Sequence, residues 1–278
     1  MTTVPIALIQ TRTPTGPAGA FAHIEPLIRQ AAADGAKLIL TPEGTNFLIQ
    51  DRERRAAVLQ TQDRDQAVRQ LRDLARALGV WLLIGSAIVK SGHEGDDRAG
   101  NRSLLIDDQG DVAATYDKLH VFDVDLPTGE RWRESAAVRP GDDAVVADTP
   151  WGRMGLTICY DVRFPQLYRA LAKAGAAMIA VPAAFTVPTG EAHWETLLRA
   201  RAIETGAWVL APAQGGAHED GRRTWGRSTV VAPWGEVVAK LDHDAPGVLL
   251  ATLDLEAVGR ARRAVPQLSH DREFGSPA

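Results

Sequence analysis

The 278-residue sequence contains a single cysteine, Cys159, and no uninterrupted apolar run of membrane-spanning length. One cysteine cannot form an intrachain disulfide, and it cannot build a thiolate metal site alone. Both absences are typical of a reducing compartment. The first residues, MTTVPIALIQ, include no basic segment, and their apolar run is too short for a signal peptide. We therefore expect a cytoplasmic protein without a membrane span.

An excess of charge of either sign is also missing. The 31 basic and 35 acidic residues give a formal net charge of -4, which offers no electrostatic reason to expect nucleic acid or an anionic membrane as a partner. The basic clusters Arg52–Arg55 and Arg260–Arg263 are short, and we interpret them as solvated helix faces. The balance of apolar and charged residues is that of a globular protein with a sizeable core.

Short runs rich in Val, Ile and Leu alternate with segments of helical periodicity, which predicts an α/β layer architecture. Turn sequences at Asp107–Asp111 and Ala232–Glu236 predict hairpins, so the sheets should be mixed. No linker divides the chain, and we expect one domain over residues 1–278, with Ser91–Gly100 as a surface loop and an extended tail over roughly 264–278. The predicted strands are Val4–Ile9, Lys37–Thr41, Val80–Val89, Ser103–Ile106, Met154–Ile158, Ala177–Val181, Trp208–Ala211, Thr229–Ala232, Val237–Lys240 and Val248–Leu253. The predicted helices are Ala18–Ala33, Asp63–Leu78, Pro165–Ala174, Glu191–Thr205 and Asp254–Arg263, the last with Asp254 as its N-cap.

Cys159 lies in the stretch GLTICYDVRFP, between an apolar run and a polar turn. The carboxyl ends of strands in open α/β sheets are common ligand sites, and Pro165 suits the first turn of a following helix. A lone cysteine is more often a small buried apolar residue than a nucleophile. A nucleophilic thiol needs a base, and neither His120 nor His193 stands in a known Cys–His signature.

Two charged residues also follow predicted strands. Glu43 in TPEG is held between Pro and Gly, and partial burial would raise its pKa toward the range of a general base. Lys118 in YDKLH could present a fixed cation to a developing oxyanion. Taken singly, a turn glutamate in water and an exposed loop lysine are the simpler interpretations.

The three signals together resemble the nitrilase (carbon–nitrogen hydrolase) superfamily. The motifs are TPEG with Glu43, YDKLHVFDVD with Lys118 and GLTICYDVRFPQL with Cys159, in the order of that family. Further similar segments are RWRES, RPGD and WGRSTVVAPWGEVVAK, and the resemblance covers nearly the whole chain. It implies an α-β-β-α sandwich, usually assembled as a homodimer or larger homo-oligomer, that uses no metal and no organic cofactor.

The resemblance also implies roles for single residues. Glu43 would be the general base, Cys159 the nucleophile and Lys118 the cation that stabilises the tetrahedral intermediate. The backbone N–H of Tyr160 would complete the oxyanion site.

Family members often carry a second glutamate after the lysine, and Glu130 and Glu134 are the two candidates here. The position of Glu134 in RWRES favours Glu134. Arg163, four residues after Cys159, is either a clamp for a substrate carboxylate or a structural ion-pair partner of Asp161 or Glu134.

Phe185 and Thr186 either wall the substrate pocket or pack as loop residues. The sequence departs from the family pattern at Asp117, where relatives usually carry Arg. It also departs in the segment after Glu43 and in the tail SHDREFGSPA.

The later segments resemble the amidase branch that contains deaminated glutathione amidase and omega-amidase. The implied activity is hydrolysis of a small carboxylate-bearing amide through a thioester, with deaminated glutathione as the first candidate substrate. The alternatives are omega-amidase activity on 2-oxoglutaramate or 2-oxosuccinamate and, in another class, a non-catalytic binding protein on the same fold.

Overall fold

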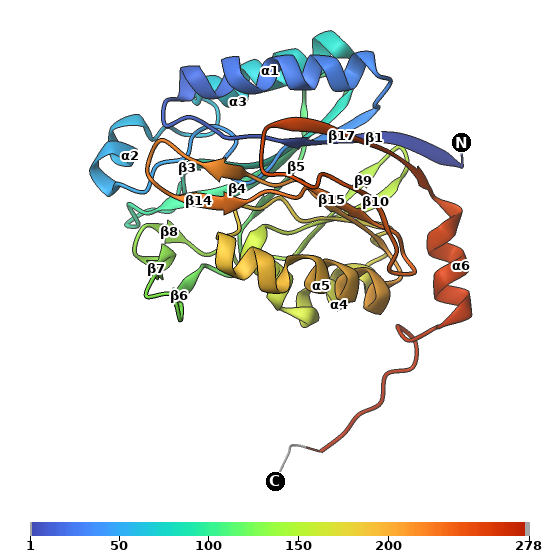
Figure 1. Ribbon diagram of the computed structural model, residues 1–278. Helices are drawn as coiled ribbons and strands as arrows, with labels where there is room; N and C mark the ends of the chain where they lie inside the picture. The colour runs from blue at the N-terminus through green and yellow to red at the C-terminus, as the bar shows by residue number, and fades with distance from the viewer. Residues whose placement is uncertain (1, 276–278) are drawn as a thin grey trace.

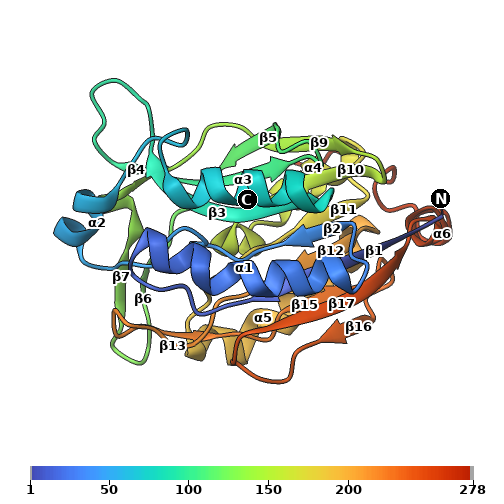
Figure 2. The same cartoon turned by 90° about the horizontal axis from the view of Figure 1, so that it is seen from above.

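The computed structural model describes residues 2–275 and consists of two β-sheets packed face to face between outer helices (Figure 1). Helices α1 (Pro17–Ala33) and α3 (Gln66–Leu78) cover one sheet, and α4 (Pro165–Lys173) and α5 (Val187–Thr205) cover the other. Both views place α2 (Arg52–Val58) at one end of the sandwich and α6 (Glu256–Ala264) at the opposite end (Figures 1 and 2). The predicted α-β-β-α sandwich is confirmed.

The first sheet has the strand order β17-β1-β2-β3-β4-β5, with β8 paired to β4. Strands β1, β2 and β3 are parallel, whereas β17, β4 and β5 join them antiparallel, so the sheet is mixed as predicted. Its strands are β1 (Thr3–Gln10), β2 (Leu38–Leu40), β3 (Trp81–Lys90), β4 (Ala99–Ile106), β5 (Val112–Asp117), β8 (Val138–Arg139) and β17 (Gly247–Asp254).

The second sheet has the order β16-β15-β12-β11-β10-β9, in which β10, β11 and β12 are parallel. Its strands are β9 (Val145–Thr149), β10 (Gly152–Leu156), β11 (Met178–Ala180), β12 (Trp208–Ala211), β15 (Thr229–Val231) and β16 (Val237–Lys240). Two small hairpins stand apart from it, formed by β6 (Asp123–Asp125) with β7 (Arg131–Arg133) and by β13 (Gly215–Ala217) with β14 (Arg223–Trp225).

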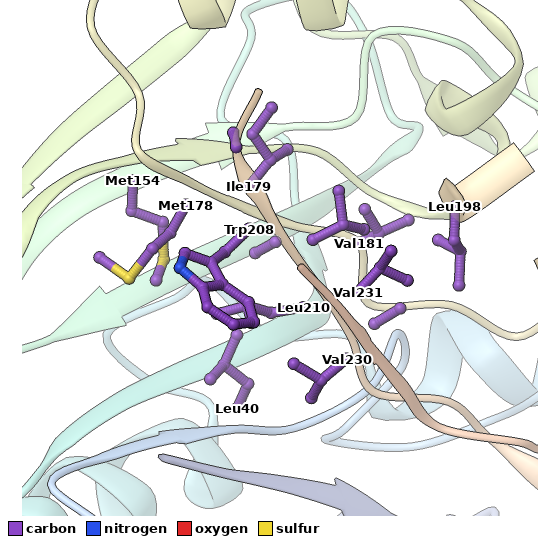
Figure 3. Packing of buried hydrophobic residues seen from close by; sticks show 14 of the residues in the cluster. Leu40, Met154, Met178, Ile179, Val181, Leu198, Trp208, Leu210, Val230 and Val231 are labelled. Atoms are coloured by element: carbon purple, nitrogen blue, oxygen red, sulfur yellow. The ribbon is translucent and has the colours of Figure 1, made fainter. Parts of the chain in front are cut away.

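Strand alternation divides the core into layers. In β1, Ile6 and Leu8 belong to the cluster shared with the second sheet, whereas Ala7 and Ile9 pack with α1 and α3. Figure 3 shows the shared cluster, in which Leu40 of the first sheet lies against Trp208 and its neighbours from the second. Side chains on both faces of the central strands are therefore buried, as expected of strands covered on both sides.

The observed helices and strands differ from the predicted ones mainly at helix starts and in very short elements. Helix α5 begins at Val187, four residues before the predicted Glu191, because a proline fits its first turn. Asp254 ends β17 and is not the N-cap of α6, although its Oδ1 accepts the N–H of Glu256 at 2.9 Å. The short strands β6, β7, β8, β9, β13 and β14 and the helix α2 were not predicted, because so few residues give no clear periodicity.

No helix within residues 2–275 combines the length and the apolar character needed to cross a membrane. After α6 the chain forms no further helix or strand up to residue 275, and Asp271 pairs with Arg169 and Lys173 of α4. Residues 276–278 of the tail predicted to be extended lie outside the described part of the chain.

Candidate active site

Glu43 lies in the tight turn that follows β2, and the backbone of β3 holds this turn in place. Oγ of Ser86 accepts the N–H of Gly44 at 2.9 Å, at a point where the β3–β4 register is irregular. A side chain at Gly85 would place its Cβ 1.9 Å from the carbonyl oxygen of Thr41. Only glycine permits so close an approach of β3 to the turn, and this approach fixes the direction of the Glu43 carboxylate.

Lys118 follows β5 and is enclosed by carboxylates. Its Nζ donates to Oε1 of Glu43 at 3.0 Å and to both carboxylate oxygens of Glu134, at 3.0 and 2.8 Å. Nδ2 of Asn101 donates to Oε1 of Glu43 at 2.8 Å, and the N–H of Ala184 donates to Oε2 at 2.9 Å. The side chain of Lys118 is 2% exposed, so these bonds form away from bulk water.

Of the two candidates for the second glutamate, the structure brings only Glu134 to Lys118. Glu134 begins a short 3₁₀ turn after β7, and its Oε2 also accepts the N–H of Phe122 at 2.6 Å. Glu130 is exposed and its carboxylate accepts from the indole of Trp132 at 3.3 Å.

Cys159 is buried and begins a 3₁₀ turn (Cys159–Arg163) three residues after Leu156, the end of β10. Its φ angle is 50°, a left-handed conformation that strains a residue other than glycine by about 1–2 kcal/mol. The N–H of Cys159 donates to the carbonyl of Pro182 at 2.8 Å, whereas the N–H of Tyr160 has no acceptor within residues 2–275. The turn therefore leaves one amide beside the thiol free to bind an oxyanion.

The carboxylate of Asp161 stabilises the same turn through hydrogen bonds. Its Oδ2 accepts the hydroxyl of Tyr116 at 2.7 Å and the N–H of Ile158 at 2.8 Å. Its Oδ1 accepts the N–H of His120 at 3.0 Å and lies 2.7 Å from Nδ1 of the same residue. The fully buried carboxylate thus connects the strand end before Cys159 with the loop that carries Lys118.

The charges at the site shift the pKa values of its three central groups. Burial raises the pKa of Glu43, but the charge of Lys118 and hydrogen bonds from Cys159, Lys118 and Asn101 outweigh burial and lower it overall. The predicted upward shift for Glu43 is therefore wrong, because a buried cation lies 3.0 Å away.

The other two groups shift upward. Burial lowers the pKa of Lys118, yet the charges of Glu134 and Glu43 raise it well above its usual value. Burial and then the charge of Glu43 raise the pKa of Cys159, which Lys118 only partly offsets. At neutral pH the resting site consequently contains a carboxylate, an ammonium group and a neutral thiol.

These side chains face a cavity of about 370 Å³. Glu43, Lys118, Glu134 and Cys159 line it together, although they come from four separate segments of the chain. Three of the four residues predicted to bind substrate, Tyr160, Phe185 and Thr186, also line this cavity.

Arg163 lies beside this cavity without lining it. Its guanidinium is 5.9 Å from the ring centre of Tyr160 and 5.5 Å from that of Phe185, and it lies 3.3 Å from Nδ1 of His193. Within residues 2–275 it forms no ion pair with an acidic side chain. The structural ion pair with Asp161 or Glu134 that the sequence allowed is therefore absent.

Asn101 donates to Glu43 and Glu134, and Asp161 holds the turn that begins at Cys159, but sequence reasoning missed both roles. The sequence feature that could have pointed to Asn101 is its amide side chain within the strand AGNRSLLI. A buried polar side chain usually has a specific hydrogen-bond partner. For Asp161 the signal was its place two residues after the cysteine. Asp117, which stands where the family usually has Arg, has a cationic partner. Arg102 donates two hydrogen bonds of 2.8 Å to its carboxylate.

Arg52 and Arg55 also line the cavity. Arg52 is exposed, as a solvated helix face requires, whereas Arg55 is partly buried, so the interpretation as a solvated face is wrong for Arg55. Within residues 2–275, no three His, Cys, Asp or Glu side chains converge as metal ligands would.

The chain is similar to known proteins over almost its full length. The sequence profile described as carbon-nitrogen hydrolase matches residues 5–263. The chain is 42% identical over 272 residues to the deaminated glutathione amidase of Yersinia enterocolitica, which covers 98% of this chain and 94% of that protein. It is 39% identical over 254 residues to the deaminated glutathione amidase of Homo sapiens, which covers 91% of this chain and 77% of that protein.

Solved structures agree with these sequence matches. The NitFhit protein of C. elegans aligns with a TM-score of 0.90 and 36% identity, over 98% of this chain and 66% of that one. A mutant of the amidase from Nesterenkonia sp. AN1, with the acetamide moiety of fluoroacetamide added to its active site cysteine, aligns with a TM-score of 0.77 and 31% identity over 94% of each chain. With a profile match that spans most of its length and relatives at this identity, the chain belongs to the carbon–nitrogen hydrolase family of enzymes, the nitrilase superfamily.

Proposed function

We propose that this enzyme is a thiol amidase that hydrolyses deaminated glutathione to 2-oxoglutarate and Cys-Gly. The observation that carries the proposal is the meeting of Cys159, Glu43 and Lys118 in one cavity whose size suits a small molecule. The similarity to two proteins named deaminated glutathione amidase, at 42% and 39% identity, supports the substrate.

In the first half of the proposed reaction, Glu43 removes the proton from Sγ of Cys159 as the sulfur attacks the amide carbon. Lys118 and the N–H of Tyr160 stabilise the oxyanion, a contribution of about 2–4 kcal/mol per well-placed donor. Glu43 then gives the proton to the amide nitrogen, the C–N bond breaks and the amine leaves. The acyl group remains on Cys159 as a thioester.

In the second half, Glu43 removes a proton from water as the water oxygen attacks the thioester carbon. The C–S bond breaks, the carboxylic acid leaves, and the sulfur recovers its proton from Glu43. The raised pKa of Cys159 and the lowered pKa of Glu43 support this order, because the thiol holds its proton until the attack begins. In this scheme Glu134 keeps Lys118 charged and in position.

The test compares deaminated glutathione with 2-oxoglutaramate, the omega-amidase alternative. Both substrates yield 2-oxoglutarate, but only the second releases ammonia and only the first releases a free dipeptide amine. We expect a higher kcat/KM for deaminated glutathione, and loss of both activities in Cys159→Ala with an unchanged melting temperature. Hydrolysis of neither substrate by the wild type would favour a non-catalytic binding protein. Full activity of Cys159→Ala would exclude the thiol mechanism.

We further propose that the enzyme works in the cytoplasm as a homodimer or larger homo-oligomer. Ile203 of α5 and Trp234 of the β15–β16 turn are 52% and 58% exposed, and this turn packs against Ile203 at Gly235. Exposed apolar side chains that adjoin one another often mark a protein interface, which supports an assembly. Light scattering of the wild type and of Ile203→Glu tests it, because a monomeric wild type would reject the assembly.

A further inference from the structure

The outer wall of the cavity that contains Cys159 is rich in arginine. These arginines come from α2, from the β6–β7 hairpin and from the β13–β14 hairpin, which both views place at the same end of the molecule (Figures 1 and 2). They are Arg52, Arg55, Arg131, Arg133, Arg222 and Arg223.

Their partners separate these arginines into two groups. Arg131 and Arg133 share the carboxylate of Asp125, at 3.7 and 2.8 Å, so each already has an acidic partner. In contrast, no acidic side chain within residues 2–275 lies within 4.0 Å of Arg52, Arg55 or Arg223, and of these three only Arg55 is partly buried. The only hydrogen bond of the Arg55 side chain in this part of the chain is a long one, 3.4 Å, to the carbonyl of Ile49.

Arg222 is nearly buried and only partly paired. Its guanidinium lies 3.2 Å from Asp220 and 5.7 Å from the ring centre of Trp132, with 18% of its side chain exposed. Its Nε–H is buried and has no hydrogen-bond partner in the described chain. A buried charged donor without an acceptor is unfavourable, and a ligand that supplies the acceptor would remove this penalty.

Arg55 and Arg222 are also close enough to repel each other. Partial burial lowers the pKa of Arg55, and the positive charges of Arg222 and Arg52 lower it further. Glu134 acts in the opposite direction, which places Arg55 within electrostatic reach of the carboxylate that binds Lys118. Two like charges on a half-buried wall are destabilising unless an anion lies between them.

We propose that Arg55 and Arg222 form a distal carboxylate subsite that binds the terminal carboxylate of the leaving amine. The inference rests on the proposed function, in which the amide carbon is attacked by Cys159 at the inner end of the cavity. The substrate class is an N-substituted amide whose amine portion is a short peptide ending in a carboxylate. Guanidinium groups bind carboxylates through paired N–H bonds. A primary amide releases ammonia, so it has no carboxylate on its leaving-amine side for these arginines to bind.

The experiment uses two substrates that differ only in this group, deaminated glutathione and its C-terminal carboxamide. We measure kcat/KM for both with the wild type and with Arg55→Ala, Arg55→Lys and Arg222→Gln. Arg54→Ala is the matched control, because Arg54 is an exposed arginine of the same helix that does not line the cavity. Melting temperatures report whether each variant folds.

We expect the wild type to prefer the acid, and Arg55→Ala and Arg222→Gln to reduce that preference about tenfold or more, mainly through KM. Arg55→Lys should retain part of the preference, and Arg54→Ala should retain all of it. If Arg222→Gln does not fold, Arg55→Ala decides alone, because Arg55 has no ion pair to lose. An unchanged preference in Arg55→Ala would overturn the subsite and leave the proposed amidase intact. A wild type inactive on both substrates would overturn the proposed function and the subsite together.

Discussion

Nζ of Lys118 lies 3.0 Å from Oε1 of Glu43, and both side chains are buried. The same ammonium group binds the partly buried Glu134 at 2.8 Å, so one buried cation pairs with two carboxylates. Removing one member of such a group leaves charges without partners, which is more damaging than removing the whole set.

Lys118→Met should therefore abolish hydrolysis and lower the free energy of unfolding by about 3–5 kcal/mol. The double variant Lys118→Met/Glu134→Gln should be more stable than Lys118→Met, because it carries one unpaired carboxylate fewer. Urea denaturation measures both. A double variant no more stable than the single one would show that the carboxylates find other partners.

In the pH profile of kcat/KM, activity should fall on the acid side only below pH 4.5. This value is the unperturbed pKa of Glu43, and the folded protein lowers the pKa of this carboxyl. The ionised form is the proposed base, so activity is lost only as the pH falls through this lowered pKa. Cys159 should add no limb near neutral pH, because its pKa lies well above 9.0. Initial rates on deaminated glutathione, with recovery checked at neutral pH, measure the profile. An acid limb near neutral pH would contradict the charge assignment.

Gly85→Ala should lower the free energy of unfolding by about 3 kcal/mol and reduce kcat, since the new Cβ would lie 1.9 Å from the carbonyl of Thr41 and displace the Glu43 turn. Gly19→Ala in α1 is the control. Its Cβ would meet Pro14 at an ordinary 3.6 Å, and a stabilisation of about 0.5–1 kcal/mol is expected for a helix. Thermal unfolding and steady-state rates compare the two variants. Equal effects would mean that β3 does not hold the turn.

His218 should make stability depend on mildly acidic pH. Burial, followed by the charge of Arg222, lowers its pKa from 6.5 to about 4. The unfolded chain therefore binds a proton between these values that the folded protein does not, so stability is full above pH 6.5 and falls as the pH drops toward 4. The effect is on the order of 3 kcal/mol at most.

His218→Gln, which preserves a polar group near the hydroxyl of Thr224, should flatten this dependence. The exposed His270 is the control site, and His270→Gln should retain the wild-type slope. Melting temperatures across this pH range provide the measurement. Parallel slopes in the wild type and His218→Gln would reject the role of His218.

Much of the fold followed from periodicity, because the central strands and the helices α1 and α3 carry long apolar patterns. The turns that carry Glu43, Lys118 and Cys159 could be predicted because each charged or reactive residue follows such a strand. The roles of Asn101 and Asp161 could not, since both depend on contacts between strands and loops far apart in the sequence. The arginines of α2 illustrate the same limit, because a charged helix face looks alike in the sequence whether it borders solvent or a cavity.

The division of the site between the sheets has one more consequence. Glu43 and Lys118 follow strands of the first sheet, whereas Cys159 follows β10 of the second, and the N–H of Ala184 reaches across from the end of β11 to Glu43. Each sheet could keep its own hydrogen bonds while the layers slide or separate, but the nucleophile and its base would then part. Catalytic activity therefore requires the two sheets to be aligned. During gradual unfolding, activity should disappear before the far-UV circular dichroism signal of the strands does.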